Sequence, residues 1–252
     1  MSSDPTIEPG PKSGNAHELD ALAPLPRARS GASAVAQAND ELALAHDIDD
    51  YYARSSAVIR WIERRRLALI AELLEVEPGQ RVLEVGCGGG HVLRLFPEAE
   101  LVGVDVSAVM LGKAKKNLAR HHVTLLRGEL SELDLPTASF DRLICTEVLE
   151  HVVDPRALLA QMRRLLRPTG IAVITLPNDP LIIRLKNAVR RLGLHRVPPL
   201  GRVAWGGDKY HLHLWELEQM RELLRPHFTL TAERFAPLAV LPIRCCFRCV
   251  PR

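Results

Sequence analysis

The chain has 252 residues, of which 47% are hydrophobic and 25% charged, and its formal net charge is +3. This length and composition suit a globular protein with a substantial core, and exclude a fibrous or wholly disordered chain. The small net charge gives no reason to expect a nucleic-acid partner. We expect neither a secretory leader nor a transmembrane segment, since no run of about eighteen apolar residues occurs.

The cysteines indicate a reducing compartment. Their number, five, is odd, and the chain is too long to depend on disulfide staples, so we expect a cytoplasmic protein. Cys246 and Cys249 have C-x-x-C spacing but lack a second pair or a flanking histidine. We therefore expect Cys245, Cys246 and Cys249 to be ordinary thiols at the end of a strand.

The composition divides the chain into a tail and one domain. Residues 1–38 are rich in Pro, Gly, Ser and Ala without a sustained apolar period, which predicts a disordered N-terminal tail. Residues 39–252 are expected to form a single domain. It opens with apolar residues at helical intervals over 42–76, which predict two helices.

Short apolar runs then alternate with amphipathic stretches. The runs predict strands at 81–85, 101–104, 123–126, 142–145, 171–176, 228–231 and 238–243. The stretches predict helices at 107–120, 154–167 and 214–224, and a turn at 167–170. This alternation predicts an α/β fold: a Rossmann-like, mostly parallel sheet of seven strands with helices on both faces.

A glycine-rich turn follows the first predicted strand, where residues 84–90 read E-V-G-C-G-G-G. Glycines let the backbone bend tightly and approach a ligand at the carboxyl edge of a parallel sheet. Glu84 could take an amino group there, and Asp105, at the end of the second strand, could accept two ribose hydroxyls. The natural register of the turn does not spell the dinucleotide fingerprint G-x-G-x-x-G.

Together these motifs resemble the class I S-adenosylmethionine (SAM) dependent methyltransferases, particularly the ubiquinone and menaquinone biosynthesis subgroup, over residues 82–178. The resemblance implies SAM as cofactor, with Glu129 and Leu130 at the position that faces adenine and Cys87 contacting SAM through its backbone. The full set of implied cofactor contacts is Glu84, Gly86, Cys87, Gly88, Gly90, Asp105, Val106, Glu129, Leu130 and Thr146.

The segment after the fourth strand reads T-E-V-L-E-H over residues 146–151. A helical turn there would place Glu147, Glu150 and His151 on one face, where they could bind a divalent metal ion that lowers the pKa of an acceptor hydroxyl. Similar strings occur in metal-free relatives, so these groups could instead position substrate, or His151 could be a general base. His211, a histidine common in the family, could complete either site. The predicted catalytic residues are His151, Glu147 and His211.

Residues 178–213 interrupt the alternation and are expected to be an insertion, or lid, over the active site. Residues 181–192 are basic and amphipathic, which favours a solvated lid helix but would also suit a membrane surface or a lipid-like substrate. We predict methyl transfer to a small or medium organic acceptor, with oxygen the favoured acceptor atom. A nicotinamide-dependent oxidoreductase and a non-catalytic SAM-binding regulator remain the alternatives.

Overall fold

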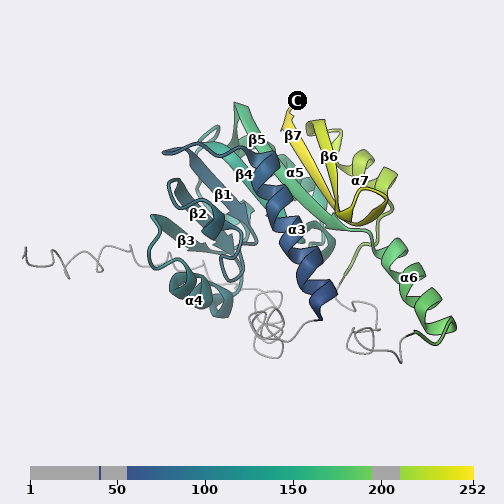
Figure 1. The fold of residues 1–252 in the computed structure, drawn as a ribbon. Helices are drawn as coiled ribbons and strands as arrows, with labels where there is room; N and C mark the ends of the chain where they lie inside the picture. Colours follow the sequence, from purple (N-terminus) through teal and green to yellow (C-terminus); the bar gives the residue numbers. More distant parts are fainter. Residues whose placement is uncertain (1–39, 41–55, 195–210) are drawn as a thin grey trace, which may run out of the picture.

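The computed structural model describes residues 40, 56–194 and 211–252 (Figure 1). The expected tail and the first of the two helices expected ahead of the sheet lie outside these residues. Within them, no helix combines the length and apolarity needed to cross a bilayer.

A seven-stranded sheet forms the centre of the molecule, in the order β3-β2-β1-β4-β5-β7-β6. All neighbours pair in parallel except β7, which runs antiparallel to both β5 and β6, so the predicted mostly parallel fold is confirmed. The strands are β1 Arg81–Val85, β2 Glu100–Asp105, β3 Val123–Arg127, β4 Phe140–Thr146, β5 Leu166–Pro177, β6 Phe228–Leu238 and β7 Leu241–Pro251.

Helices cover both faces of this sheet. Side chains of α3 and α4 pack into the core on one face, and those of α5 and α7 pack into the core on the other. Figure 1 shows α3 lying across the strands and α6 extending away from them. The helices are α3 Ala57–Leu74, α4 Ala108–Asn117, α5 Pro155–Leu165, α6 Asp179–Arg191 and α7 Leu217–Leu224, with short 3-10 turns η1 Leu93–Leu95, η2 Leu130–Glu132 and η3 Leu149–His151.

The central strands are apolar on both faces because helices cover both. In β1, Val82 packs toward α3 and α4, whereas its neighbour Leu83 packs toward α5 and α7. Each is fully buried, which contributes about 1.5–3 kcal/mol per side chain. The continuous apolar runs in the sequence therefore predicted these strands correctly.

Two local expectations need correction. The expected turn at 167–170 lies inside β5, as an irregularity in its pairing with β4: Phe140 pairs with Leu166 and Arg142 with Ile171, so four residues of β5 oppose one of β4. The strand expected at 238–243 begins at Leu241 and continues to Pro251. Its pairing between β5 and β6 places the three late cysteines inside the sheet, not at a strand end.

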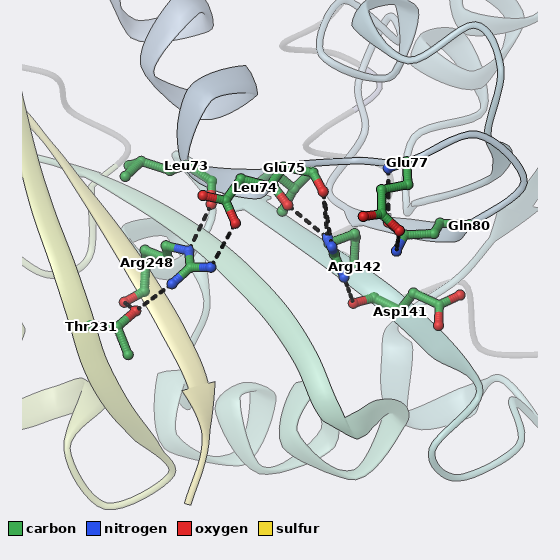
Figure 2. A network of polar contacts seen from close by, with 9 residues as sticks. All are labelled: Leu73, Leu74, Glu75, Glu77, Gln80, Asp141, Arg142, Thr231 and Arg248. Carbon is green, nitrogen blue, oxygen red and sulfur yellow. Dashed lines mark hydrogen bonds and ion pairs between the residues drawn. The ribbon is translucent and has the colours of Figure 1, made fainter.

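Two arginines from the sheet bind the C-terminal end of α3 (Figure 2). Arg142 donates through Nε to the Leu74 carbonyl at 2.7 Å and through a terminal nitrogen to the Glu75 carbonyl at 2.9 Å. Arg248 donates through Nε to the Leu73 carbonyl at 3.1 Å and pairs with the Glu75 carboxylate at 2.9 Å. The last turn of α3 contains no basic residue, so β4 and β7 supply the cations that favour a helix C-terminus.

We expect Arg142→Ala to destabilise the protein by about 3 kcal/mol, because it leaves carbonyls at the end of α3 without their charged donor. Urea unfolding followed by circular dichroism measures the change. Arg225→Ala is the control: it removes an exposed ion pair with Glu218, which is worth about 0–1 kcal/mol. Equal losses in the two variants would show that Arg142 contributes no more than a surface charge.

Candidate functional site

The glycine turn after β1 has the close geometry that its sequence predicts. The N–H groups of Gly86 and Cys87 both donate to the Val104 carbonyl, at 2.8 and 3.0 Å, which joins the turn to β2. Gly86 has φ of 69°, and a Cβ atom there would lie 2.4 Å from a methyl group of Val148. Only glycine therefore lets the turn pack against the segment that follows β4.

Asp105 at the end of β2 connects the turn to the start of α4. One carboxylate oxygen accepts the Gly88 N–H at 2.8 Å and the other accepts the Ser107 N–H at 2.9 Å. Burial raises the pKa of Asp105, and these two hydrogen bonds oppose the rise. The carboxylate thus lies directly beside the glycine turn, as the sequence predicts.

Asp40 also reaches this corner, and no motif in the sequence indicates it. Its carboxylate accepts the Ser107 hydroxyl at 2.5 Å and the Val109 N–H at 3.2 Å. The Arg127 guanidinium lies 3.5 Å from its other oxygen. A residue far ahead of the sheet therefore adds negative charge next to Asp105, whose pKa it helps to raise.

Glu84 is the most unusual group of the turn. Glu84 is 1% exposed, and its Oε2 has no hydrogen-bond partner among the described residues. Burial raises the pKa of Glu84 well above its ordinary value, and the nearby Arg66 guanidinium opposes that rise. A buried carboxylate oxygen without a partner is costly. A ligand cation with N–H donors would offset this cost.

Charged residues from three elements meet behind the turn. On α3, Glu63 and Arg66 form a buried ion pair at 2.9 Å. Arg244 of β7 lies 3.5 Å from Glu63 and 3.2 Å from Glu147. Burial works against the Arg244 charge, but attraction to Glu147 and Glu63 prevails and raises the pKa of Arg244. Neither Glu63, Arg66 nor Arg244 belongs to a recognisable motif, and the sequence interpretation missed all three.

The segment after β4 differs from the expected helical turn. Glu147 has φ of 55°, in the left-handed region, and only Leu149–His151 forms a single 3-10 turn. The Glu147 carboxylate faces Arg244 and accepts the Thr175 hydroxyl at 3.0 Å. The shared face expected for Glu147, Glu150 and His151 therefore does not form, because the backbone reverses at Glu147 before the 3-10 turn begins.

Glu150 and His151 instead come together with His211. Potential ligand atoms of the three side chains lie within 4.8 Å of one another, and the two histidine rings meet edge to face with centroids 4.8 Å apart. Glu150 is fully buried, and neither carboxylate oxygen has a hydrogen-bond partner in the described part of the chain. Burial raises the pKa of Glu150, and the charge of Glu147 adds to the rise. Two imidazoles and a carboxylate are suitable ligands for a divalent cation.

The remaining predicted cofactor contacts lie at or just after the carboxyl ends of β1 to β4 and differ in exposure. Cys87 is buried, and burial raises the pKa of its thiol well above the ordinary value, so it is a poor nucleophile. Glu129 is exposed and caps η2, whereas the side chain of Leu130 is buried in the core. Val106 follows β2 directly, and Thr146 is the last residue of β4.

Part of the chain is similar in sequence to known proteins. The methyltransferase domain family matches residues 83–174. Residues 83–174 therefore resemble a methyltransferase domain. It is 33% identical over 117 residues to a ubiquinone biosynthesis O-methyltransferase of Rhodopseudomonas palustris, covering 45% of this chain and 46% of that protein. The mitochondrial enzyme of the same name from Schizosaccharomyces pombe is 31% identical over 130 residues, covering 49% and 47%. The chain spans about half the length of the curated relatives it matches.

Solved structures share the fold of this chain. The N-methyltransferase NodS from Bradyrhizobium japonicum, solved with S-adenosyl-L-homocysteine (SAH), superposes with a TM-score of 0.61 at 21% identity, covering 87% of this chain and 99% of NodS. A protein from Pyrococcus horikoshii superposes with a TM-score of 0.62 at 20% identity, covering 84% and 99%. The family resemblance and the fold predicted from the sequence are confirmed.

The raised pKa of Glu84 predicts that the stability of the ligand-free protein depends on pH. A carboxyl group with a raised pKa makes the folded protein bind more protons than the unfolded one, so stability falls as the pH rises above about 4.5. One such proton contributes at most about 1.4 kcal/mol per pH unit. We expect Glu84→Gln to remove this contribution and to be more stable than the wild type at neutral pH.

Urea unfolding of the ligand-free protein between about pH 5 and 8 measures this effect. Glu98→Gln is the matched control, because Glu98 is exposed, and it should leave the pH dependence unchanged. If Glu84→Gln retains the full slope of the wild type, another group carries the pH dependence.

Proposed function

We propose that this chain is an SAM-dependent methyltransferase that transfers the methyl group to an oxygen atom of a small or medium organic acceptor. The observation that carries the proposal is Glu84, a buried carboxylate with an unpartnered oxygen directly before the glycine turn. The ammonium group of a methionine moiety would supply the missing donor and charge. SAH in the structure of NodS supports the cofactor, and the O-methyltransferase relatives support oxygen as the acceptor atom.

The proposed cofactor contacts surround the carboxyl ends of β1 to β4. In this proposal Asp105 accepts ribose hydroxyls, the role of an acid at the end of the second strand of such sheets. The turn residues Gly86 and Gly88 let the backbone lie close to the cofactor, and Glu129 lies at the position proposed for adenine. The contacts proposed for Cys87, Gly90, Val106, Leu130 and Thr146 complete the set.

Methyl transfer needs an aligned and deprotonated acceptor. The acceptor oxygen forms a bond to the methyl carbon while the carbon–sulfur bond breaks, and the hydroxyl proton passes to a base. We propose His151 and His211 as the groups that take this proton, since their rings adjoin at the end of the sheet where β4 leads into the site. Glu147, held by Arg244 and Thr175, is proposed to position the acceptor.

As the alternative to proton transfer, the same cluster is proposed to bind a divalent cation. The donor set suits it: two histidines and Glu150, whose unpartnered oxygens a cation would satisfy. When bound, such a cation would lower the pKa of an acceptor hydroxyl. Glu147, part of the ligand set expected from the sequence, faces Arg244 instead and is replaced by His211 in this proposal.

Helix α6 supports an apolar or lipid-like acceptor. Asp179 is its only buried residue, and it combines half-exposed aliphatic side chains with Arg190 and Arg191. Such a helix also suits peripheral contact with an anionic membrane surface. The cytoplasm remains the proposed location, which the five unpaired cysteines support.

We expect SAH, but not NADH, to stabilise the wild-type protein. At about one hundred times its dissociation constant the gain is about 2.7 kcal/mol, seen as a rise in melting temperature. Asp105→Ala should abolish this gain while the circular dichroism spectrum stays native, and the exposed Asp134→Ala should retain it. Undiminished SAH affinity in Asp105→Ala would exclude the ribose assignment, and stabilisation by NADH would favour the oxidoreductase alternative.

Metal dependence has its own test. If a cation is bound, chelation should lower turnover, and Glu150→Gln, His151→Ala and His211→Ala should lose the response to added metal together. Glu147→Gln should keep that response, because its carboxylate faces Arg244. Turnover is measured as SAH formation with a mixture of small-molecule acceptors, with and without chelator. Full activity in chelator would leave the cluster with positioning and proton transfer only.

A further inference from the structure

A buried carboxylate–histidine pair adjoins the proposed base. His211 Nδ1 lies 2.7 Å from Asp179 Oδ2, and the two side chains are only 10% and 11% exposed. Asp179 is the first residue of α6, and His211 lies thirty-two residues later in the chain. The sequence predicts a role for His211 but not for Asp179, because no local spacing connects the two.

This contact determines which ring nitrogen of His211 carries the proton. A carboxylate oxygen accepts and does not donate, so a neutral ring at 2.7 Å must present Nδ1–H to Asp179. The lone pair then remains on Nε2, the nitrogen that can accept a proton or bind a cation. The His211 ring also meets His151 edge to face, which places it within the proposed catalytic cluster.

The backbone on both sides of the pair is held in place. The Asn178 N–H donates to the Ile243 carbonyl at 3.0 Å, and the Asn178 side chain caps the start of α6. After His211, the Leu212 and His213 N–H groups both donate to the Glu150 carbonyl, at 2.8 and 3.3 Å. Asp179 and His211 therefore meet on two segments whose backbones are hydrogen-bonded in place. Asp179 can fix the orientation of the His211 ring only if both backbones are held in this way.

A second pair joins the same two parts of the chain outside the site. Arg184 of α6 lies 2.6 Å from Glu216, with the two side chains 71% and 56% exposed. An ion pair this exposed is worth about 0–1 kcal/mol and does not touch His211. The structure thus contains an inner pair that reaches the histidine and an outer pair that only joins the segments.

We propose that Asp179 is a positioning residue of the methyl-transfer site, which holds His211 as the Nδ1–H tautomer with the ring lone pair on Nε2. This inference rests on the proposed function for its catalytic consequence, but the tautomer itself does not depend on that function. Partners that orient a reactive or ligating histidine typically contribute about 10–100-fold to activity or metal affinity.

The test is long-range ¹H–¹⁵N spectroscopy of the chelator-treated full-length protein labelled at histidine, with His211→Gln used to assign the signals. We expect an Nδ1–H signal for His211 in the wild type, and loss of that tautomer preference in Asp179→Ala. Arg184→Ala, which breaks the outer pair, should keep the wild-type tautomer. An Nε2–H ring in the wild type, or an unchanged ring in Asp179→Ala, would overturn the proposal.

Turnover and cofactor binding separate this inference from the proposed function. With an acceptor that the wild type methylates, Asp179→Asn should lower kcat about 10–100-fold while KM for SAM stays unchanged. Arg184→Ala should retain the wild-type kcat, so an equal loss in both variants would reduce Asp179 to a tether and overturn the proposal. Calorimetry with SAH reports on the proposed function alone, because a wild-type protein that does not bind SAH would refute that function and leave the tautomer result standing.

Discussion

The site depends on positive charges that lie close to the carboxylates at the carboxyl edge of the sheet. The buried Glu84 and Glu150 and the half-buried Glu147 lie beside the ends of β1 and β4, and in the described part of the chain Arg66 and Arg244 bring positive charge to them. Leaving a buried charge unpaired is far more costly than any single apolar contact. For this reason α3 and β7, which carry the two arginines, must lie close to these acids. The excess of acid left after this pairing is what suits the site to a cationic cofactor.

This requirement explains why α3 is fixed to the sheet at two places. Glu63 and Arg66 join it to β7 and the site, while Arg142 and Arg248 bind its last carbonyls. Glu63 lies eleven positions before Leu74, the last residue of the helix, or about 16–17 Å at helical rise. A helix held at one place alone could swing its charges away from Glu84. Attachment at two places keeps the counter-charge in position when no cofactor is bound.

The sequence predicts the parts of this molecule that depend on neighbouring residues. Apolar runs predicted seven strands, and the glycines with Glu84 and Asp105 predicted the turn, because period and φ are local properties. It did not predict the left-handed backbone at Glu147 or its contact with Arg244, 97 residues away along the chain. A pattern of i, i+3 and i+4 indicates one helical face only if the backbone is helical. Here the backbone leaves the helical region at Glu147, next to Val148, whose side chain packs against Gly86.

The residues proposed to hold SAM are close together in the sequence, whereas those proposed to act on the methyl acceptor are far apart. The residues proposed to hold SAM follow β1 to β4 within one continuous stretch, so they form a motif that relatives share. The groups proposed to act on the acceptor and the residues that hold them come from segments far apart: Glu147 after β4 is held by Arg244 on β7, and His211 ahead of α7 is held by Asp179 on α6. Both of these pairs lie partly or wholly outside residues 83–174, over which the chain matches the methyltransferase domain family. The family match therefore bears on the residues proposed to hold SAM, and the acceptor has to be sought through the chemistry of these long-range contacts.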